Sequence, residues 1–350
     1  MRWDHLRIEA GEDEARLPGY RDPAVVRRFD APEALDMRFY EVRAKSALNR
    51  VPKASQMPFR WTINPYRGCS HACVYCFARP THTYLDFDAG RGFEREIVVK
   101  VNAPEVVRAE LARPAWKGEH VAMGTNTDPY QWVESRYRLM PGIWEAMRDA
   151  RNPCSILTKS PLVLRDLDVL REVAAVAEVR ANLSIPTLDP KAWRATEPHT
   201  PHPRARLEAV AELNRAGIPT GVLIAPLMPG INDAPEQVEP LLEAAVEAGA
   251  TGLGGIALHL RGEVRGLFFA WLREHRPDLV ERYERLYARG AYAPAEERRR
   301  LAALLRHPDL PPPSRFRSPD PHPGSDRAPA AGDGGPQRAP APPEIQEALF

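Results

Sequence analysis

The sequence predicts an α/β protein: a partial (βα)6 barrel of the TIM type with parallel strands, an N-terminal extension and a disordered C-terminal tail. From residue 59 onward, short apolar runs alternate with amphipathic stretches of helical length, and neighbouring parallel strands need such crossovers. Near residue 310 the composition changes, because residues 311–350 hold 11 prolines and 4 glycines, too many for a packed core. We therefore expect four parts: an extension over residues 1–58, the barrel over 59–276, a helical segment over 277–309 and a disordered tail over 310–350.

The elements follow in chain order. The extension is charged and weakly periodic, and we expect one helix in it, near Pro32–Arg43. The six barrel strands are expected at Arg60–Asn64, His120–Gly124, Cys154–Thr158, Val179–Ile185, Thr220–Ala225 and Gly252–Leu258. The helices between and after them are expected at Ala103–Arg113, Arg138–Ala150, Val163–Val176, Arg204–Ala216, Pro235–Ala248 and Val264–His275. Gly217 and Gly249 directly follow two of these helices, as is common at a helix C-terminus. Six units make an incomplete barrel, whose active face should lie at the carboxyl ends of the strands.

Charge and hydropathy exclude two classes of protein. The 350 residues include 48 Lys+Arg and 47 Asp+Glu, so the net charge of +1 argues against a general polyanion binder but leaves room for a local basic groove. The first residues lack the apolar core of a signal peptide, and no apolar run is long enough to span a bilayer. We therefore expect a cytoplasmic protein that does not enter a membrane.

Three of the four cysteines lie in one short loop. Cys69, Cys73 and Cys76 fall within eight residues directly after the first barrel strand, while Cys154 stands alone. Clustered thiols in a reducing compartment indicate metal ligands rather than disulfides. Three thiolates can hold three corners of a cubane iron–sulfur cluster and leave one iron open to an amine and a carboxylate. Gly68 would let the backbone turn tightly at this point.

The segment Asn64–Phe77, with Tyr75 just before the third cysteine, resembles the cluster motif of the radical S-adenosylmethionine superfamily. The resemblance extends over roughly residues 40–275, and the stretch Thr127–Gln131 is similar to the branch related to spore photoproduct lyase. It implies a [4Fe-4S] cluster, S-adenosylmethionine, and an external electron donor such as flavodoxin or ferredoxin. In that family the reduced cluster cleaves S-adenosylmethionine, and the resulting 5′-deoxyadenosyl radical abstracts hydrogen from a substrate.

The resemblance also implies roles for residues at the strand ends. Tyr75 is expected beside the cofactor, and Gly124, Thr125 and Asn126 near its amino group, although this stretch departs from the Gly-Gly-Glu pattern of many members. Ser184 is expected near the ribose, Glu197 and Arg206 at the hydroxyls and the carboxylate, and Leu227 near the adenine. Candidates for a catalytic role toward the substrate are Asp128, Tyr130 and Lys159.

Three readings of the function stay open at this stage. The first is a radical enzyme that acts on nucleic acid, repairing DNA as the photoproduct lyase does, because cations and rings alternate after the cysteine loop; these are Arg67, Arg79, Tyr84, Phe87, Arg91, Phe93, Arg95 and Lys100. The second is a radical enzyme with a small-molecule or protein substrate. The third is a zinc-stabilised binding protein without enzymatic activity, with His71 or His82 as fourth ligand.

The remaining cysteine bears on the first reading. The photoproduct lyase uses an additional cysteine as hydrogen donor, and the spare cysteine of this chain is Cys154. It begins its strand, about 13 Å from the active end at about 3.3 Å per residue. We therefore expect that this chain does not use the same radical relay.

Overall fold

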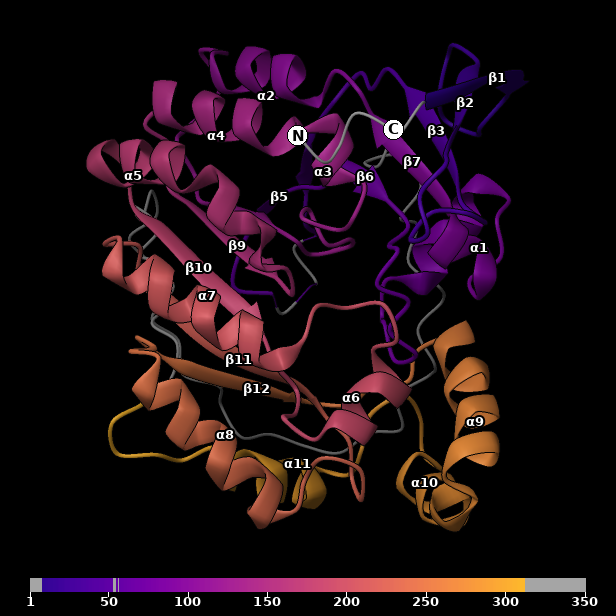
Figure 1. Cartoon of the computed structure of the whole chain (residues 1–350), viewed down its shortest axis with the longest axis vertical. Helices are drawn as coiled ribbons and strands as arrows, with labels where there is room; N and C mark the ends of the chain where they lie inside the picture. Colours follow the sequence, from indigo (N-terminus) through magenta and orange to yellow (C-terminus); the bar gives the residue numbers. More distant parts are fainter. Residues whose placement is uncertain (1–7, 53–54, 56, 312–350) are drawn as a thin grey trace, which may run out of the picture.

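The computed structural model describes residues 8–52, 55 and 57–311 (Figure 1). It contains two sheets, with orders β1-β2-β3-β7-β6 and β12-β11-β10-β9-β8-β5-β4. The predicted tail over 310–350 lies outside the described residues, apart from its first two. Those two pack on the barrel, because Leu310 is buried and the Pro311 carbonyl accepts a hydrogen bond from the Leu253 amide.

The larger sheet confirms the predicted barrel. Six of its strands run parallel, as predicted: β5 (Trp61–Ile63), β8 (Val121–Met123), β9 (Cys154–Thr158), β10 (Val179–Ser184), β11 (Thr220–Leu227) and β12 (Leu253–Ala257). Each overlaps an expected strand. A short strand, β4 (Leu48–Arg50), adds antiparallel to β5. Since β4 belongs to the predicted extension, the sheet reaches across the expected boundary at residue 58, and the limits of the four parts stay a prediction.

The crossover helices also lie where the amphipathic pattern predicts them. They are α2 (Ala103–Leu111), α4 (Leu139–Asp149), α5 (Leu167–Val176), α7 (Pro203–Arg215), α8 (Pro235–Glu247) and α9 (Glu263–His275). Figure 1 shows α4, α5, α7 and α8 lined up along one side of the larger sheet. Their apolar faces join the strands in one core, in which Trp144 and Leu213 are almost completely buried. Burial of such faces is the main stabilising contribution to helices of this length.

The predicted helix at Pro32–Arg43 is wrong. That part of the chain contains β3 (Arg38–Val42), which pairs with β2 (Ala24–Phe29) and, in parallel, with β7 (Glu96–Lys100). Aromatic and β-branched side chains of β3 suit a half-buried strand, and the edge they join is supplied by β7, from the distant first crossover. The hydrophobic periodicity of residues 32–43 gives no sign of β7 as the pairing partner.

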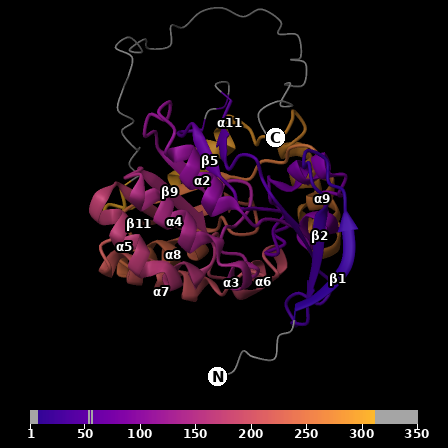
Figure 2. The ribbon, with the colours of Figure 1, turned by 90° about the horizontal axis from the view of Figure 1, so that it is seen from above.

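The smaller sheet is completed by β1 (Ile8–Ala15) and by β6 (Tyr66–Arg67), which pairs antiparallel with β7. In Figure 2, β1 and β2 lie at the opposite side of the molecule from α5 and α8. Strand β6 ends directly before Gly68, so the smaller sheet holds the base of the cysteine loop. The N-terminal extension therefore helps to hold the cysteine loop, a role that its composition did not indicate.

Shorter elements fill the connections. They are η1 (Arg79–Leu85), α1 (Arg91–Arg95), α3 (Glu134–Tyr137), η2 (Pro161–Asp166), α6 (Pro190–Thr196), η3 (Pro277–Leu279), α10 (Val280–Leu286) and α11 (Ala295–Ala303). The last three confirm helical structure in the segment 277–309. A second core joins α9 and α10 to the cysteine loop through Cys73 and Tyr75. Among the described residues, no helix has the length and apolar character that crossing a membrane requires.

Candidate functional site

The cysteine loop begins with a turn that only glycine fits well. Gly68 has φ of +79°, and a Cβ there would lie 2.9 Å from both Ile97 Cδ1 and the Phe93 carbonyl oxygen. The next amide, of Cys69, donates to the same Phe93 carbonyl at 2.9 Å. The tight turn predicted at Gly68 is therefore confirmed, and it places the first thiol against the first crossover.

The three thiols of the loop share one shielded environment. Cys69 and Cys73 are buried and Cys76 is partly exposed. Burial raises the pKa of Cys73 to about 12 and raises the pKa of Cys69 and Cys76, and the neighbouring thiolates raise the pKa of Cys69 further. Burial thus favours the protonated thiols. A bound metal cation reverses this preference, because it deprotonates a thiol that coordinates it. Among the described residues, no three His, Cys, Asp or Glu side chains are arranged as ligands of a single metal ion.

Backbone amides point at two of these sulfurs. The amide of Asp128 donates to Cys69, and the amides of Ala78 and Arg79 donate to Cys76; each of these bonds lowers the thiol pKa. Hydrogen bonds to sulfur are a usual means of stabilising cluster thiolates. Three thiols on one loop with amide donors behind them fit the ligand set of an iron–sulfur cluster.

The loop after β8 lies against this thiol group. It begins at Gly124, with φ of +84°, where a Cβ would come within 1.9 Å of the Leu157 carbonyl oxygen. Asn64, at the end of β5, accepts from the Asn126 amide at 3.1 Å and contacts the Thr125 hydroxyl. The predicted stretch Gly124–Asn126 is therefore held against the neighbouring strands, and its residues remain partly exposed.

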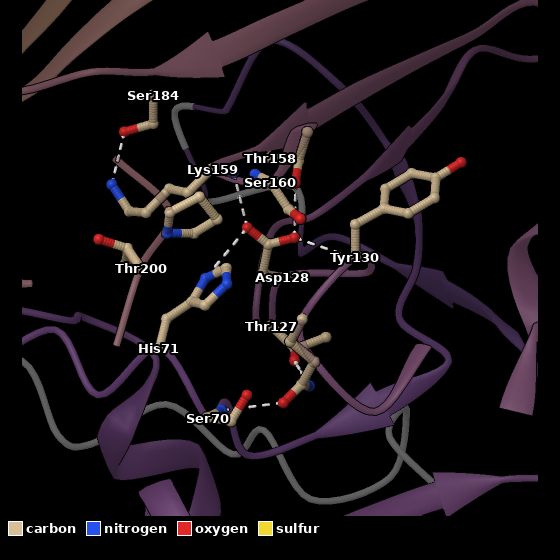
Figure 3. A network of polar contacts seen from close by, with 12 residues as sticks. Ser70, His71, Thr127, Asp128, Tyr130, Thr158, Lys159, Ser160, Ser184 and Thr200 are labelled. Carbon is tan, nitrogen blue, oxygen red and sulfur yellow. Dashed lines mark hydrogen bonds and ion pairs between the residues drawn. The ribbon is translucent and has the colours of Figure 1, made fainter. Parts of the chain in front are cut away.

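Asp128 is the central residue of this loop (Figure 3). Its carboxylate accepts hydrogen bonds from the Thr158 hydroxyl and the Lys159 amide, both at 2.7 Å, and from the Tyr130 amide at 2.9 Å. His71 Nδ1 lies 3.3 Å from the same carboxylate. Burial favours the neutral acid, but His71 and these donors outweigh it and lower the pKa of Asp128. The residue is placed to orient the cysteine loop against β9.

Gln131 makes a second connection to the cysteine loop. It is fully buried, accepts from the Ser70 amide at 2.9 Å, and donates to the Gly68 carbonyl and to the Thr127 hydroxyl. Thr127 also donates to the Gly68 carbonyl, at 2.7 Å. We call Thr127, Asp128 and Gln131 together the Asp128 clamp.

A second group of buried polar residues holds the other side of the loop. Glu197 is 1% exposed and forms ion pairs of 2.7 Å with Lys159 Nζ and with the guanidinium of Arg206. Burial works to raise the pKa of Glu197, but the two cations lower it to about 2. The Tyr75 hydroxyl donates to the same carboxylate, and burial raises the pKa of Tyr75 so that it stays protonated. We call Lys159, Glu197 and Arg206 the Glu197 clamp.

The structure thus brings together most of the residues predicted for the cofactor. Lys159 Nζ also donates to the Ser184 hydroxyl at 2.7 Å, at the carboxyl end of β10. Figure 3 shows Lys159 reaching from the Asp128 side toward Ser184. Leu227 lies in the barrel core at the end of β11. The candidate site therefore lies at the carboxyl ends of the strands, as predicted.

Arg206 departs from its expected role. It is completely buried, and its donors are used by the carbonyls of Pro201 and Ser184, the Thr200 hydroxyl and Glu197. With its guanidinium surrounded in this way, Arg206 positions Glu197 rather than presenting a free fork of donors to a carboxylate.

Tyr130 also lies apart from the centre of the site. Its ring points away from Asp128 in Figure 3, and its hydroxyl donates to Asp166 at 2.8 Å and accepts from Trp144 Nε1. The side chain is 1% exposed. Its hydroxyl thus serves the packing of η2 and α4, and a catalytic role for Tyr130 stays a prediction.

Cys154 and the two histidines considered as zinc ligands, His71 and His82, lie in three different environments. Cys154 is buried at the first residue of β9, the end opposite Thr158, as predicted. His82 Nε2 lies 2.8 Å from the Glu96 carbonyl, and His71 faces Asp128. Both histidines considered as a fourth zinc ligand are therefore placed against other groups.

Part of the patch of cations and rings predicted for nucleic acid is enclosed, while Tyr84 and Arg91 stay exposed. Phe93 and Lys100 are buried, and the fully enclosed Arg79 donates to the carbonyls of Ala72 and Cys73 inside the loop. Arg79, predicted for the patch, and Gln131, not predicted as a site residue, instead contact the backbone of the cysteine loop. The sequence indicates these contacts only weakly, because the carbonyls and amides that the two side chains bind come together only in the folded loop.

The comparisons with known proteins agree with this geometry. A family model described as Radical SAM superfamily matches residues 63–245, more than half of the chain. An uncharacterized protein of Mycobacterium tuberculosis H37Rv is 44% identical over 352 residues, covering 100% of this chain and 98% of that protein. An uncharacterized protein of Methanocaldococcus jannaschii is 29% identical over 195 residues, covering 55% of this chain and 69% of that protein.

Solved structures of spore photoproduct lyase share the fold. The complex with dinucleoside spore photoproduct has a TM-score of 0.56 and 17% identity, covering 76% of this chain and 77% of that chain. A doubly substituted variant with bound AdoMet and the same dinucleoside has a TM-score of 0.53 and 18% identity, covering 72% and 74%. At this identity the likeness concerns the fold.

Proposed function

This chain belongs to the radical SAM superfamily of enzymes, and we propose that Cys69, Cys73 and Cys76 hold a [4Fe-4S] cluster that reductively cleaves S-adenosylmethionine. When bound and reduced, such a cluster supplies the electron that breaks the sulfonium bond, and the 5′-deoxyadenosyl radical so formed abstracts hydrogen from the substrate. The observation that carries the proposal is the thiol triplet on one short loop, with Cys69 and Cys73 buried and all three thiols free.

The chain's own residues would do three things for that chemistry. The two clamps hold the cysteine loop at Ser70 and at Tyr75, so that they would fix the orientation of a cluster bound by its thiols. The partly exposed Gly124, Thr125 and Asn126 would receive the amino group of the cofactor. Ser184, fixed by Lys159, would lie near the ribose, and Leu227 near the adenine.

The Glu197 clamp has a separate role in the proposal. Glu197 stays ionised near neutral pH because Lys159 and Arg206 lower its pKa to about 2. It accepts from Tyr75, which stands between the second and third cysteines. We infer that Glu197 orients Tyr75 and Lys159 toward the cofactor, with Arg206 acting behind it. Asp128 in turn positions the cysteine loop.

The proposal places the enzyme in the cytoplasm, where thiols stay reduced, with an external electron donor such as flavodoxin or ferredoxin. All four cysteines are free in the described structure. We leave the reaction on the substrate open between nucleic acid, as the dinucleoside complex of spore photoproduct lyase suggests, and a small-molecule or protein target.

Metal analysis tests the proposal directly. We expect anaerobically reconstituted protein to be brown, to contain iron and sulfide, and to form 5′-deoxyadenosine from S-adenosylmethionine after reduction. Substituting Cys69→Ala, Cys73→Ala or Cys76→Ala should abolish stable iron binding, while Cys154→Ala, the matched control at the far end of β9, should retain it. Zinc in place of iron, or unchanged iron content in the three loop variants, would support the zinc-stabilised binding protein instead.

A further inference from the structure

Beside the cysteine loop, three rings from distant parts of the chain line up on the surface. The ring centroids of Phe77 and His259 are 5.8 Å apart, and those of His259 and Tyr292 are 5.6 Å apart. The interplanar angles are 38° and 28°. Arg261 extends the series, with its guanidinium carbon 5.1 Å from the Tyr292 ring centroid. We call Phe77, His259, Tyr292 and Arg261 the aromatic ladder.

The ladder has a rigid base. Leu258 and Leu260 are each 2% exposed and point into the core, so the alternation of an extended chain turns His259 outward. Tyr292 is fixed beside it by a β-bridge to His259 and by the bond from the Leu260 amide to the Ala291 carbonyl, at 2.8 Å. The rings are therefore presented by paired backbone rather than by a free loop.

The ladder presents its rings to solvent. Phe77 is 49% exposed and Tyr292 is 48% exposed, the highest values among the Phe, Tyr and Trp side chains of the described structure. Arg261 is exposed and forms no ion pair with a carboxylate in the part of the chain that the structure describes. The exposed ring faces of Phe77 and Tyr292 and the positive charge of Arg261 therefore lie together on one surface.

The ladder also adjoins the candidate site. Phe77 directly follows Cys76, the most exposed of the three cysteines, and His259 follows the carboxyl end of β12. A molecule stacked on the ladder would therefore lie at the same edge of the barrel as the cysteine loop. In the predicted patch of cations and rings in residues 67–100, by contrast, Arg79, Phe93 and Lys100 are buried.

We propose that the aromatic ladder binds single-stranded nucleic acid, with unpaired bases stacking on Tyr292 and Phe77 and a phosphate beside Arg261. Stacking suits every base because every base has a flat π face, and a guanidinium next to the rings supplies the charge that the backbone needs. An apolar peptide would need no cation at this position, and the near-zero net charge of the chain argues against a general polyanion binder. The binding does not depend on the radical chemistry, because no ladder residue is a proposed ligand of the cluster or of S-adenosylmethionine.

The test measures binding by full-length protein carrying its metal centre, without S-adenosylmethionine. The probes are a short labelled oligothymidylate, an oligouridylate of equal length, and an abasic strand with the same number of phosphates, all followed by fluorescence anisotropy. We expect the base-bearing strands to bind more tightly than the abasic strand. Tyr292→Leu and Phe77→Leu, which keep apolar bulk but remove the ring, should each weaken base-bearing strands by about 5-fold or more.

Two further variants make the test specific. Tyr292→Phe keeps a ring and should bind within about 2-fold of the parent, while Arg261→Gln should reduce the slope of log affinity against log salt by about 1. Val176→Ala, an exposed apolar side chain on α5, should change nothing. Iron content of each variant shows that the loop is intact.

Each result of these binding measurements either supports or contradicts nucleic-acid binding by the ladder. Equal affinity for abasic and base-bearing strands, or unchanged binding in both leucine variants, would overturn the proposal. Strand binding that depends on the rings, in a protein that fails to cleave S-adenosylmethionine, would uphold the ladder and reject the proposed chemistry.

Discussion

The two clamps hold the same loop by different physical means. In the Asp128 clamp, a carboxylate and an amide are satisfied mainly by uncharged donors and by backbone groups of Ser70 and Gly68. In the Glu197 clamp, one carboxylate lies between two cations, and all three charges are largely removed from water. Lys159 connects the two, since its amide donates to Asp128 and its ammonium pairs with Glu197.

This difference predicts how much stability is lost when a substitution disrupts each clamp. Hydrogen bonds from uncharged donors contribute modestly, and their loss is local. Breaking a buried ion pair leaves an uncompensated charge, which is far more costly than the pair itself is stabilising. We therefore expect the Glu197 clamp to be the more fragile of the two, although both hold the cysteine loop.

The largest effect is expected from Arg206→Met. This change leaves Glu197 buried with Lys159 as its remaining cation, and we expect a loss of about 3–5 kcal/mol in the free energy of unfolding. Arg204→Met, two residues earlier on the exposed face of α7, is the matched control and should stay within about 0.5 kcal/mol of the parent. Urea unfolding followed by circular dichroism measures both. A loss in Arg206→Met no greater than in the control would show that the charged contacts contribute little.

The next effect concerns acid pH. The pKa of Glu197 falls from 4.5 to about 2 on folding, so its contribution is complete above pH 4.5 and is lost as pH falls toward 2. The size of this contribution is about 3 kcal/mol. Glu197→Gln removes the titrating group, and the difference in unfolding free energy between parent and variant should shrink across that window. A difference that stays constant from pH 5.5 to pH 2.5 would contradict the assigned pairing.

A smaller effect is expected from Asp128→Asn. The amide keeps the shape but offers one acceptor fewer to the Thr158 hydroxyl and the Lys159 amide, at a cost of about 1–3 kcal/mol. The same variant should shift the electron paramagnetic resonance signal of the reduced cluster, because it removes the negative charge of the Asp128 side chain beside Cys69. Thr127→Val, elsewhere in the clamp, loses the bond to the Gly68 carbonyl and the bond that the hydroxyl accepts from Gln131, and serves as the comparison. A cost in Asp128→Asn above that of Arg206→Met would reverse the ranking of the two clamps.

Much of this architecture is visible in the sequence because its determinants are local. The strands β9 and β10 and their helices follow from apolar runs of the right period, and the cysteine spacing and Gly68 indicate a metal loop wherever the chain places it. The segment Pro32–Arg43 shows the limit of that approach. Its strand exists because β7, more than fifty residues away, supplies an edge.

The sequence by itself determined the barrel, the thiol triplet and the carboxyl-end position of the site, because helix period, strand period and turn geometry act over a few residues. The tertiary structure alone decided that Glu197 meets Lys159 and Tyr75, that Arg206 is enclosed, and that Phe77 stacks with His259 and Tyr292. Such pairings join residues far apart in the chain, and they are selected by which polar groups must find partners when the whole core leaves water.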